Sequence, residues 1–254
     1  MNDLGLAYYI NLLKNLASNA TDKKLELAFM GYPDIVVTPN GYEGLLTKEA
    51  YESLEDRPNS ENIKIIHKGK KRAGTIHIVP TLSSLTEAIL KDFDVEASYT
   101  IFDFQTYEGT ETIHDFNEPI DRKFYNKYHL LWNGGTLEHI FDIACALKNM
   151  TLVTKEGGFL AHLGPLNMVN HGFVNLCPVL FDNFYAVNNG TIIRCEVSPL
   201  SDTHQTHIID DANKRVQILP NKECTLNVLV QKNKHKDKLE TPIQGRYTQT
   251  SPWV

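Results

Sequence analysis

Two histidines stand in short polar segments whose residue types suit proton transfer and substrate binding. His139 ends the segment NGGTLEH, and His171 lies within the segment NMVNHGF. Because an imidazole titrates near neutral pH, either histidine can accept a proton from a hydroxyl or an amine. We predict His139 and His171 as catalytic residues, and Asn167, Asn170 and His171 as substrate-binding residues. The alternative is that both segments are ordered turns whose polar groups bond their own backbone.

Each of these segments lies next to an apolar run that predicts a β-strand. The run YHLLWN ends at Asn133 and Gly134, and the run GGFLAHLGPL precedes the loop of His171. In an open α/β sheet, ligands bind in the crevice outside the carboxyl ends of the parallel strands. We therefore expect the two polar segments to face each other across one crevice.

Residues 136 to 150, TLEHIFDIACALKNM, predict a helix that begins directly after two glycines. Neighbouring residues of an α-helix project about 100° apart, so Glu138 and His139 are not expected to share one face. A carboxylate in the first turn is stabilised by the positive end of the helix. The sequence therefore favours a structural role for Glu138.

Short apolar runs alternate with helical segments, which is the pattern of βαβ units and a mainly parallel sheet. From residue 75, TIHIV predicts a strand, and Ser84 to Glu87 fit a capping box that begins a helix. Strands follow in ASYTIFDF, ETIHDF and YHLLWN, and TIIRCEVS and CTLNVLVQK predict an antiparallel finish. We predict an N-terminal extension (1–74) packed on the core and an α/β domain (75–254).

The order of these elements resembles that of class I S-adenosylmethionine-dependent methyltransferases. The resemblance is carried by IFDF, TIHDFNEPI, YHLLWNGGTLEHIFD, LKNMTLVTKEGGFLAHLGPLN and NHGF, within roughly residues 75 to 230. In that family an acidic residue ends the second strand and a small polar motif follows the fourth. The resemblance implies a Rossmann-like α/β fold with S-adenosylmethionine as cofactor. GTLEH and NHGF are most similar to a bacterial branch that acts on small molecules or sugars.

The resemblance also implies roles for individual residues. Asp103 would accept hydrogen bonds from the ribose hydroxyls of the cofactor, and Asp115 with Phe116 would contact its adenine. Asn133 and Gly134 would lie beside the methyl group. Local structural roles are the alternative, because Asp103 can simply end a strand and DFNEP is also a sound turn.

One motif of the family is missing. Its first strand is normally followed by an E/D-x-G-x-G-x-G loop, where glycine lets the backbone approach the cofactor. The fifteen glycines of this chain form no G-x-G, and IVPTLSS stands at the matching place after TIHIV. Ser83 and Ser84 at a helix N-terminus could still bind a carboxylate through hydroxyl and backbone N–H groups. The sequence therefore indicates a divergent member that holds the cofactor differently.

Composition and charge indicate which kinds of molecule this protein is expected to bind. A formal net charge of -6 gives no basic field, which argues against nucleic acid as the main partner. The four cysteines form no C-x-x-C pair, which favours reduced thiols of a cytoplasmic protein over a zinc site. His204 and His207 have metal-compatible spacing but no evident third ligand, so no metal is expected. We find no secretory signal and no apolar run of about 18 residues, so we expect no membrane partner.

The leading expectation is methyl transfer from S-adenosylmethionine to a small-molecule or saccharide-like acceptor. The alternative is a catalytically inactive methyltransferase-like domain that binds a ligand or a protein, and the missing glycine-rich loop is the feature that separates the two. A dehydrogenase is disfavoured because the dinucleotide-binding fingerprint is absent as well. The sequence does not predict the oligomeric state.

Overall fold

The chain is described by a computed structural model over residues 3–21, 23–33, 35, 45–54, 81–106, 112–200, 206–212, 214 and 222–247. The α-helices are α1 (Asp3–Ser18), α3 (Lys48–Glu52), α5 (Leu82–Leu90), α6 (Ile143–Val153) and α7 (Pro178–Val187). The 3-10 helices are η1 (Lys91–Phe93), η2 (Arg122–Phe124), η3 (Leu137–His139) and η4 (Gly245–Tyr247). The strands are β1 (Lys24–Met30), β2 (Glu96–Asp103), β3 (Thr112–Ile113), β4 (Tyr128–Gly134), β5 (Thr154–Pro165), β6 (Gly190–Pro199), β7 (His207–Ile208) and β8 (Cys224–Lys232).

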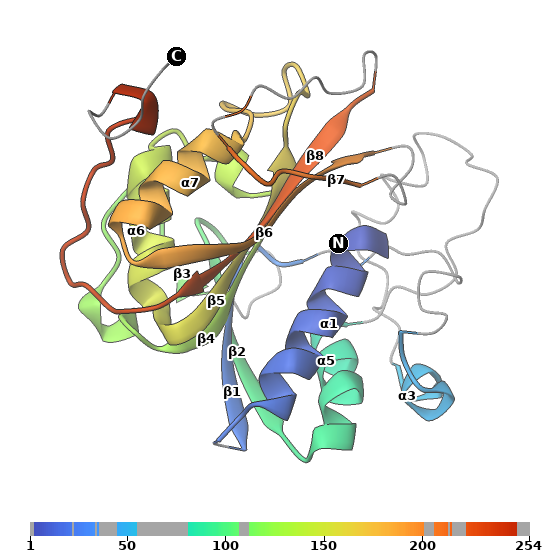
Figure 1. Cartoon of the computed structure of the whole chain (residues 1–254). Coiled ribbons are helices and arrows are strands. Elements are labelled where there is room, and N and C mark those ends of the chain that lie inside the picture. The colour runs from blue at the N-terminus through green and yellow to red at the C-terminus, as the bar shows by residue number, and fades with distance from the viewer. Residues whose placement is uncertain are drawn as a thin grey trace. The chain divides into compact units, whose positions relative to one another are not determined.

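These strands form one sheet in the order β3-β2-β1-β4-β5-β8-β6-β7 (Figure 1). The pairs β2–β3, β1–β4 and β4–β5 are parallel. Strand β8 is antiparallel to both of its neighbours, β5 and β6, and the short β7 is antiparallel to β6. The prediction of a Rossmann-like, mostly parallel α/β sheet with an antiparallel C-terminal strand is confirmed. The run 3-2-1-4-5 is the doubly wound order, in which the chain reverses direction across the sheet between β1 and β4.

Strand β1 corrects the predicted position of the first strand. The sequence predicts the first strand of the family's order in TIHIV, which lies outside the described residues. In the structure KLELAFM forms β1 and pairs with β4, with Leu27 opposite Leu130 and Met30 opposite Asn133. The segment that follows this first strand of the sheet therefore begins after Met30, at Gly31. Residues that were assigned to the N-terminal extension are thus part of the sheet.

The chain divides into two compact units, one of residues 1–25 and 33–98 and the other of residues 26–32 and 99–254. In the first unit, α1 and α5 lie side by side (Figure 1), and the Tyr9 hydroxyl is 2.7 Å from the Thr86 hydroxyl. Helix α5 begins earlier than the predicted capping box. Its N-cap is Thr81, whose side chain accepts a hydrogen bond from the Ser84 N–H.

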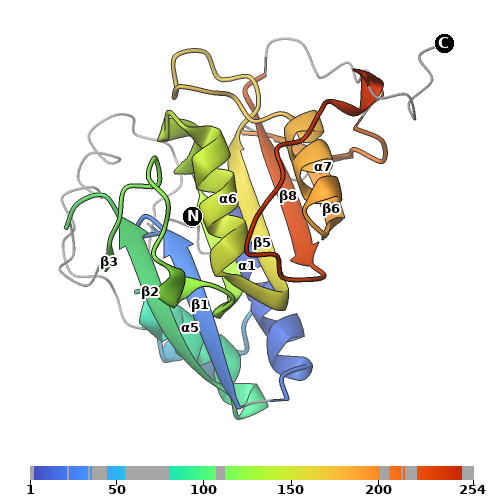
Figure 2. The same ribbon diagram turned by 90° about the vertical axis from the view of Figure 1, so that its left-hand side faces the viewer.

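In the second unit, helices α6 and α7 cover one face of the strands. Helix α6 packs on β4 and β5, while α7 packs on β8 and β6 (Figure 2). The buried core between them includes Tyr128, Leu160, Phe181 and Val228. Helix α7 was not predicted, because PVLFDNFYAV is apolar on most sides and shows no clear helical stripe. Among the described residues, no helix is long and apolar enough to cross a membrane.

Candidate functional site

Three neighbouring strands end close together in the second unit. The last residue of β1, Met30, stands opposite Asn133 near the end of β4. The Gly31 N–H donates a 2.8 Å hydrogen bond to the carbonyl of Phe102, next to Asp103 at the end of β2. We call Gly31, Asp103, Asn133 and Thr136 the strand-end group. The carboxyl ends of parallel strands at a reversal of strand order are where α/β sheets bind ligands.

Gly31 has close neighbours on both sides. Its φ of +71° lies in the left-handed region, which favours glycine. A Cβ atom at this position would lie 3.0 Å from the Thr136 hydroxyl oxygen and 3.8 Å from an Asp103 carboxylate oxygen. The same Thr136 hydroxyl donates a 2.8 Å hydrogen bond to the Met30 carbonyl. The glycine therefore brings bare backbone between two polar side chains.

Asn133 fixes the turn after β4. Its side-chain oxygen accepts the N–H groups of Thr136, at 3.2 Å, and Leu137, at 2.9 Å. Its side-chain nitrogen is buried and has no hydrogen-bond partner among the described residues. A buried donor without a partner costs about 1–3 kcal/mol, so a ligand acceptor at this point would recover stability. Gly134, the next residue, ends β4 and pairs with Leu163 of β5.

Only the second part of the predicted helix 136–150 is an α-helix, from Ile143 onward. Leu137 to His139 form the single turn η3, Ile140 is extended, and α6 starts only at Ile143. The cause is the side chain of Asp142, which accepts the Cys145 N–H and caps α6. Glu138 and His139 are therefore not in an α-helix, so the expectation that their side chains project about 100° apart does not apply.

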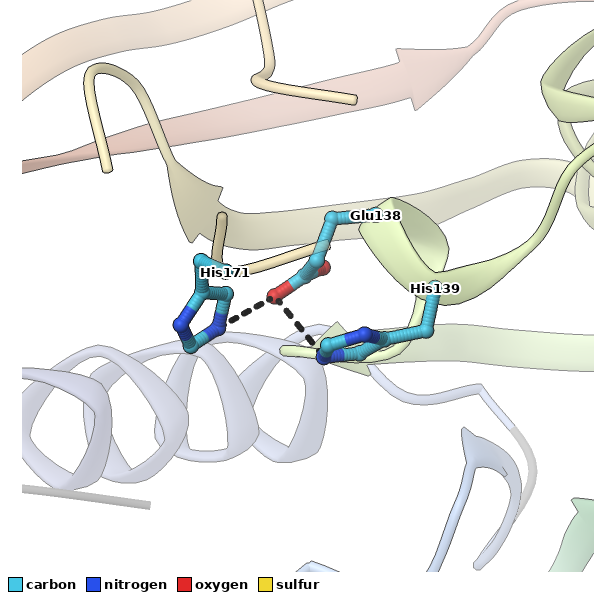
Figure 3. A group of neighbouring side chains, drawn as sticks. All are labelled: Glu138, His139 and His171. Carbon is cyan, nitrogen blue, oxygen red and sulfur yellow. Dashed lines mark ion pairs between the residues drawn. The ribbon is translucent and has the colours of Figure 1, made fainter. Parts of the chain in front are cut away.

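Glu138, His139 and His171 form a compact group, which we call the Glu138 cluster (Figure 3). The carboxylate oxygen Oε1 of Glu138 lies 3.6 Å from Nε2 of His171 and 4.0 Å from Nε2 of His139. The two imidazole rings have centroids 5.3 Å apart. The expectation that the segments after β4 and β5 converge is therefore confirmed, and Glu138 is the member that sequence reasoning missed.

The Glu138 side chain is 1% exposed, whereas those of His139 and His171 are 49% and 46% exposed. The carboxylate is thus covered by the protein, whereas both rings are about half exposed to solvent. Burial raises the pKa of the Glu138 carboxyl above its ordinary value, and the charges of the two histidines oppose that rise. Its second oxygen, Oε2, has no hydrogen-bond partner among the described residues.

Backbone contacts hold the loop of His171 against η3. The carbonyl of Glu138 accepts the N–H groups of Phe173, at 2.9 Å, and Val174, at 3.3 Å. A Cβ atom on Gly172 would lie 2.6 Å from that carbonyl oxygen, and one on Gly164 of β5 would lie 3.1 Å from Oε2 of Glu138. Glycine at these two positions leaves the room that the Glu138 side chain and backbone occupy.

The acidic and aromatic residues predicted to bind the cofactor have different surroundings. Asp103 is partly buried, and its Oδ1 accepts the Gln105 N–H at 3.3 Å. Asp115 is exposed and accepts both the backbone and side-chain N–H groups of Asn117, which lowers the pKa of its carboxyl. Phe116 is buried in the core, edge-on to Phe102. The local turn that was the alternative for DFNEP is therefore present.

Of the predicted substrate residues, Asn167 is engaged within the protein. Its amide donates to the carbonyl of Lys222 at 2.9 Å and accepts the N–H of Cys224 at 2.7 Å, which ties the loop to β8. Asn170 is exposed and has a φ of +59°, directly before His171. Ser83 and Ser84 belong to α5 in the first unit, where both hydroxyls lie close to that of Thr81.

No protein-family model matches the chain, and no curated protein matches it. Among solved structures, the chain is similar to the CMeT domain of the citrinin polyketide synthase, with 10% identity and a TM-score of 0.48 over 91% of this chain and 53% of that one. It is also similar to a putative sarcosine dimethylglycine methyltransferase from Galdieria sulphuraria, with 12% identity and a TM-score of 0.39 over 91% and 84%. A third similar structure is the [4+2]-cyclase SpnF, with 13% identity and a TM-score of 0.39 over 89% and 80%.

The chain spans about half the length of the first two similar structures, the CMeT domain and the carbon methyltransferase of CurJ. At such identities and TM-scores, these likenesses carry no information on substrate or reaction. The fold assignment therefore stands on the strand order and directions of the sheet itself.

Proposed function

We propose that this protein transfers a methyl group from S-adenosylmethionine to a small-molecule or saccharide-like acceptor. The observation that carries the proposal is the turn after β4. This turn contains Asn133, which is a member of the strand-end group. Five residues later it contains Glu138, which is a member of the Glu138 cluster. The strand-end group would thus bind the cofactor and the Glu138 cluster would bind the acceptor, and one short segment connects the two groups.

The strand-end group has features that fit a bound cofactor. It contains an orphaned buried donor on Asn133 and a backbone position at Gly31 where a Cβ would meet Thr136. The Asp103 carboxylate would accept hydrogen bonds from the ribose hydroxyls, and the Asn133 amide would donate to an oxygen acceptor. S-adenosylmethionine, when bound, supplies an electrophilic methyl group on a sulfonium and leaves as a neutral thioether.

The Glu138 cluster would serve the acceptor. As the acceptor oxygen or nitrogen forms its bond to the methyl carbon and the carbon–sulfur bond breaks, the acceptor must lose one proton. His139 or His171 would take that proton on Nε2, and the Glu138 carboxylate would stabilise the imidazolium that results. The rest of the contribution is positioning, because an in-line displacement needs its two reacting atoms held in contact.

A second candidate is a binding domain without methyl transfer. It is favoured by the segment after β1, which begins Gly31-Tyr32-Pro33 and offers no G-x-G. Pro33 has no N–H to donate, so this backbone has fewer donors for a cofactor than the loop of the family. Binding and turnover must therefore be measured separately.

Calorimetric titration with S-adenosylmethionine and S-adenosylhomocysteine tests the proposal first. We expect one-site binding of both, with dissociation constants between about 1 μM and 1 mM, the range of typical enzyme KM values. No heat and no thermal shift at millimolar cofactor would overturn it. Binding without S-adenosylhomocysteine formation over a panel of methyl glycosides and hydroxy acids would favour the binding domain.

A further inference from the structure

We propose that the Glu138 cluster is a binding site for a divalent transition-metal ion of the Zn²⁺ type. The ligands would be one carboxylate oxygen of Glu138 and the Nε2 atoms of His139 and His171. Two imidazoles and one carboxylate are a ligand set that Zn²⁺ takes in catalytic sites, where a fourth position stays open. No metal-binding motif marks this site in the sequence, because its ligands come from segments that follow two different strands.

The distances come close to those of a coordinated ion. The three candidate ligand atoms all lie within 4.8 Å of one another, and the two distances to Glu138 Oε1 are 3.6 and 4.0 Å. Ligand atoms about 2.0–2.2 Å from a tetrahedral ion are about 3.3–3.6 Å apart. The Glu138–His171 distance already fits this range, the Glu138–His139 distance must shorten by about 0.4–0.7 Å, and the two imidazole nitrogens, at most 4.8 Å apart, must also come closer. Because both rings are about half exposed, small rotations of their side chains can provide this approach.

The buried carboxylate is the second, independent observation. Glu138 is 1% exposed, and none of the described residues donates a hydrogen bond to Oε2. Burying a carboxylate without donors is costly, and proteins offset that cost by pairing the charge or coordinating a metal. The Nε2 atoms of the two histidines lie 3.6 and 4.0 Å from Oε1, and Oε2 lacks a donor, so a cation between the three groups would compensate the buried carboxylate.

The cluster is also positioned as a metal site requires. The Glu138 carbonyl binds the backbone of Phe173 and Val174, which fixes the loop of His171 relative to η3. Gly164 and Gly172 pack directly on Glu138, so the carboxylate has little room to turn away. The exposed sides of the two rings leave open coordination positions toward the solvent.

This inference deepens the proposed function and rests on it for the meaning of those open positions. A zinc ion with three protein ligands can expand from four- to five-coordinate, so an ion there would bind an acceptor that presents two neighbouring oxygen donors, such as a vicinal diol or a 2-hydroxy acid. Both histidines would then be ligands, and neither could be the proton acceptor. The ion would instead lower the pKa of the bound acceptor hydroxyl, whose proton would pass to solvent water before methyl transfer.

Zinc titration of tag-free, EDTA-stripped protein tests the site directly. We expect one Zn²⁺ per chain by calorimetry and by elemental analysis after dialysis, and a visible absorption band when Co²⁺ replaces it. His139→Gln and His171→Gln should each weaken Zn²⁺ binding by at least about tenfold, the effect that even supporting residues of metal sites have. Glu138→Gln should do the same, and His207→Gln, an exposed histidine on β7, is the matched control.

Two results would overturn the inference: wild-type protein that retains no Zn²⁺, or cluster variants that bind it as the control does. If Glu138→Gln does not fold, the two variants of the half-exposed histidines decide the question. The cofactor titration keeps the two proposals apart. Zinc binding without S-adenosylmethionine binding would end the proposed function, whereas methyl transfer by a protein that retains no Zn²⁺ would end the metal site alone.

Discussion

His171 places its Nε2 atom 3.6 Å from Oε1 of Glu138, although the two residues follow different strands of the sheet. The loop of His171 is not free to leave, because the Glu138 carbonyl accepts two of its backbone N–H groups. The ends of β4 and β5 therefore present one joined set of polar groups. Substitutions of single residues in this arrangement can therefore test their effects on turnover and on cofactor affinity separately.

His171→Ala should lower turnover and leave cofactor affinity nearly unchanged, because the loop is assigned to the acceptor. Loss of a proton acceptor or of a metal ligand at this position should reduce kcat by about 100-fold or more. Initial rates of S-adenosylhomocysteine formation, with calorimetry of cofactor binding, measure both effects. His207→Ala is the control. An equal loss of cofactor affinity would move His171 to the cofactor site, and full activity would leave it a loop residue.

Asp103→Ala should weaken S-adenosylmethionine binding by about 1–3 kcal/mol, the range for stranding buried polar partners. The partly buried carboxylate lies beside Gly31 at the end of β2. Asp121→Ala is a suitable control, because Asp121 is exposed and its side chain caps only η2. Calorimetry on both variants decides the point. Equal affinities would remove Asp103 from the cofactor site.

Gly31→Ala should destabilise the protein and weaken cofactor binding. A left-handed φ costs an alanine about 1–2 kcal/mol, and its Cβ would also press on Thr136 at 3.0 Å. Gly157→Ala is a matched control, since Gly157 has a φ of +79° with nothing within 4 Å of its Cβ position. Chemical unfolding should show similar backbone costs, with a larger loss of affinity at Gly31. Equal affinities in the two variants would exclude backbone contact at Gly31.

Much of the sheet could be predicted, because its central strands are continuous apolar runs bounded by glycine. The convergence of His139 and His171 also followed from the sequence, since parallel strands bring their carboxyl ends to one edge. The place of β1 did not follow, because strand pairing over more than a hundred residues leaves no local signal. The role of Glu138 was missed for a similar reason. Its burial depends on Gly164 and Gly172, which come from elsewhere in the chain.

Because of His162, the stability of the protein should decrease as the pH is lowered from neutral. This residue is fully buried, its Nε2 lies 2.6 Å from the Tyr185 hydroxyl, and burial lowers the pKa of its imidazole from 6.5 to about 3. Between these values the unfolded chain binds a proton that the folded chain does not. The stabilisation is therefore complete above pH 6.5 and is lost, by up to about 1.4 kcal/mol per pH unit, as pH falls toward 3.

Urea unfolding at pH 7 and pH 5 measures this dependence. His162→Gln, which cannot titrate, should be less stable at pH 7 but should lose less stability between the two pH values. The exposed His207→Gln should behave as the wild type. An unchanged pH dependence in His162→Gln would assign the effect to other groups.

Phe141 and Phe173 should bind the ring of a saccharide-like acceptor. They follow His139 and His171 by two residues each, are 77% and 67% exposed, and meet edge to face at 5.5 Å. The exposed rings offer apolar faces on which an acceptor ring can pack, and we take about 0.5–1.5 kcal/mol, the value for a pair of aromatic rings, for such a contact. Phe141→Ala and Phe173→Ala should therefore raise the acceptor KM by about two- to tenfold, with the cofactor dissociation constant unchanged.

Steady-state kinetics with an accepted methyl glycoside measures this change in KM. The control is Ile208→Ala, because Ile208 is an exposed apolar residue on β7. If both phenylalanine variants match that control, the acceptor lies on another side of the Glu138 cluster.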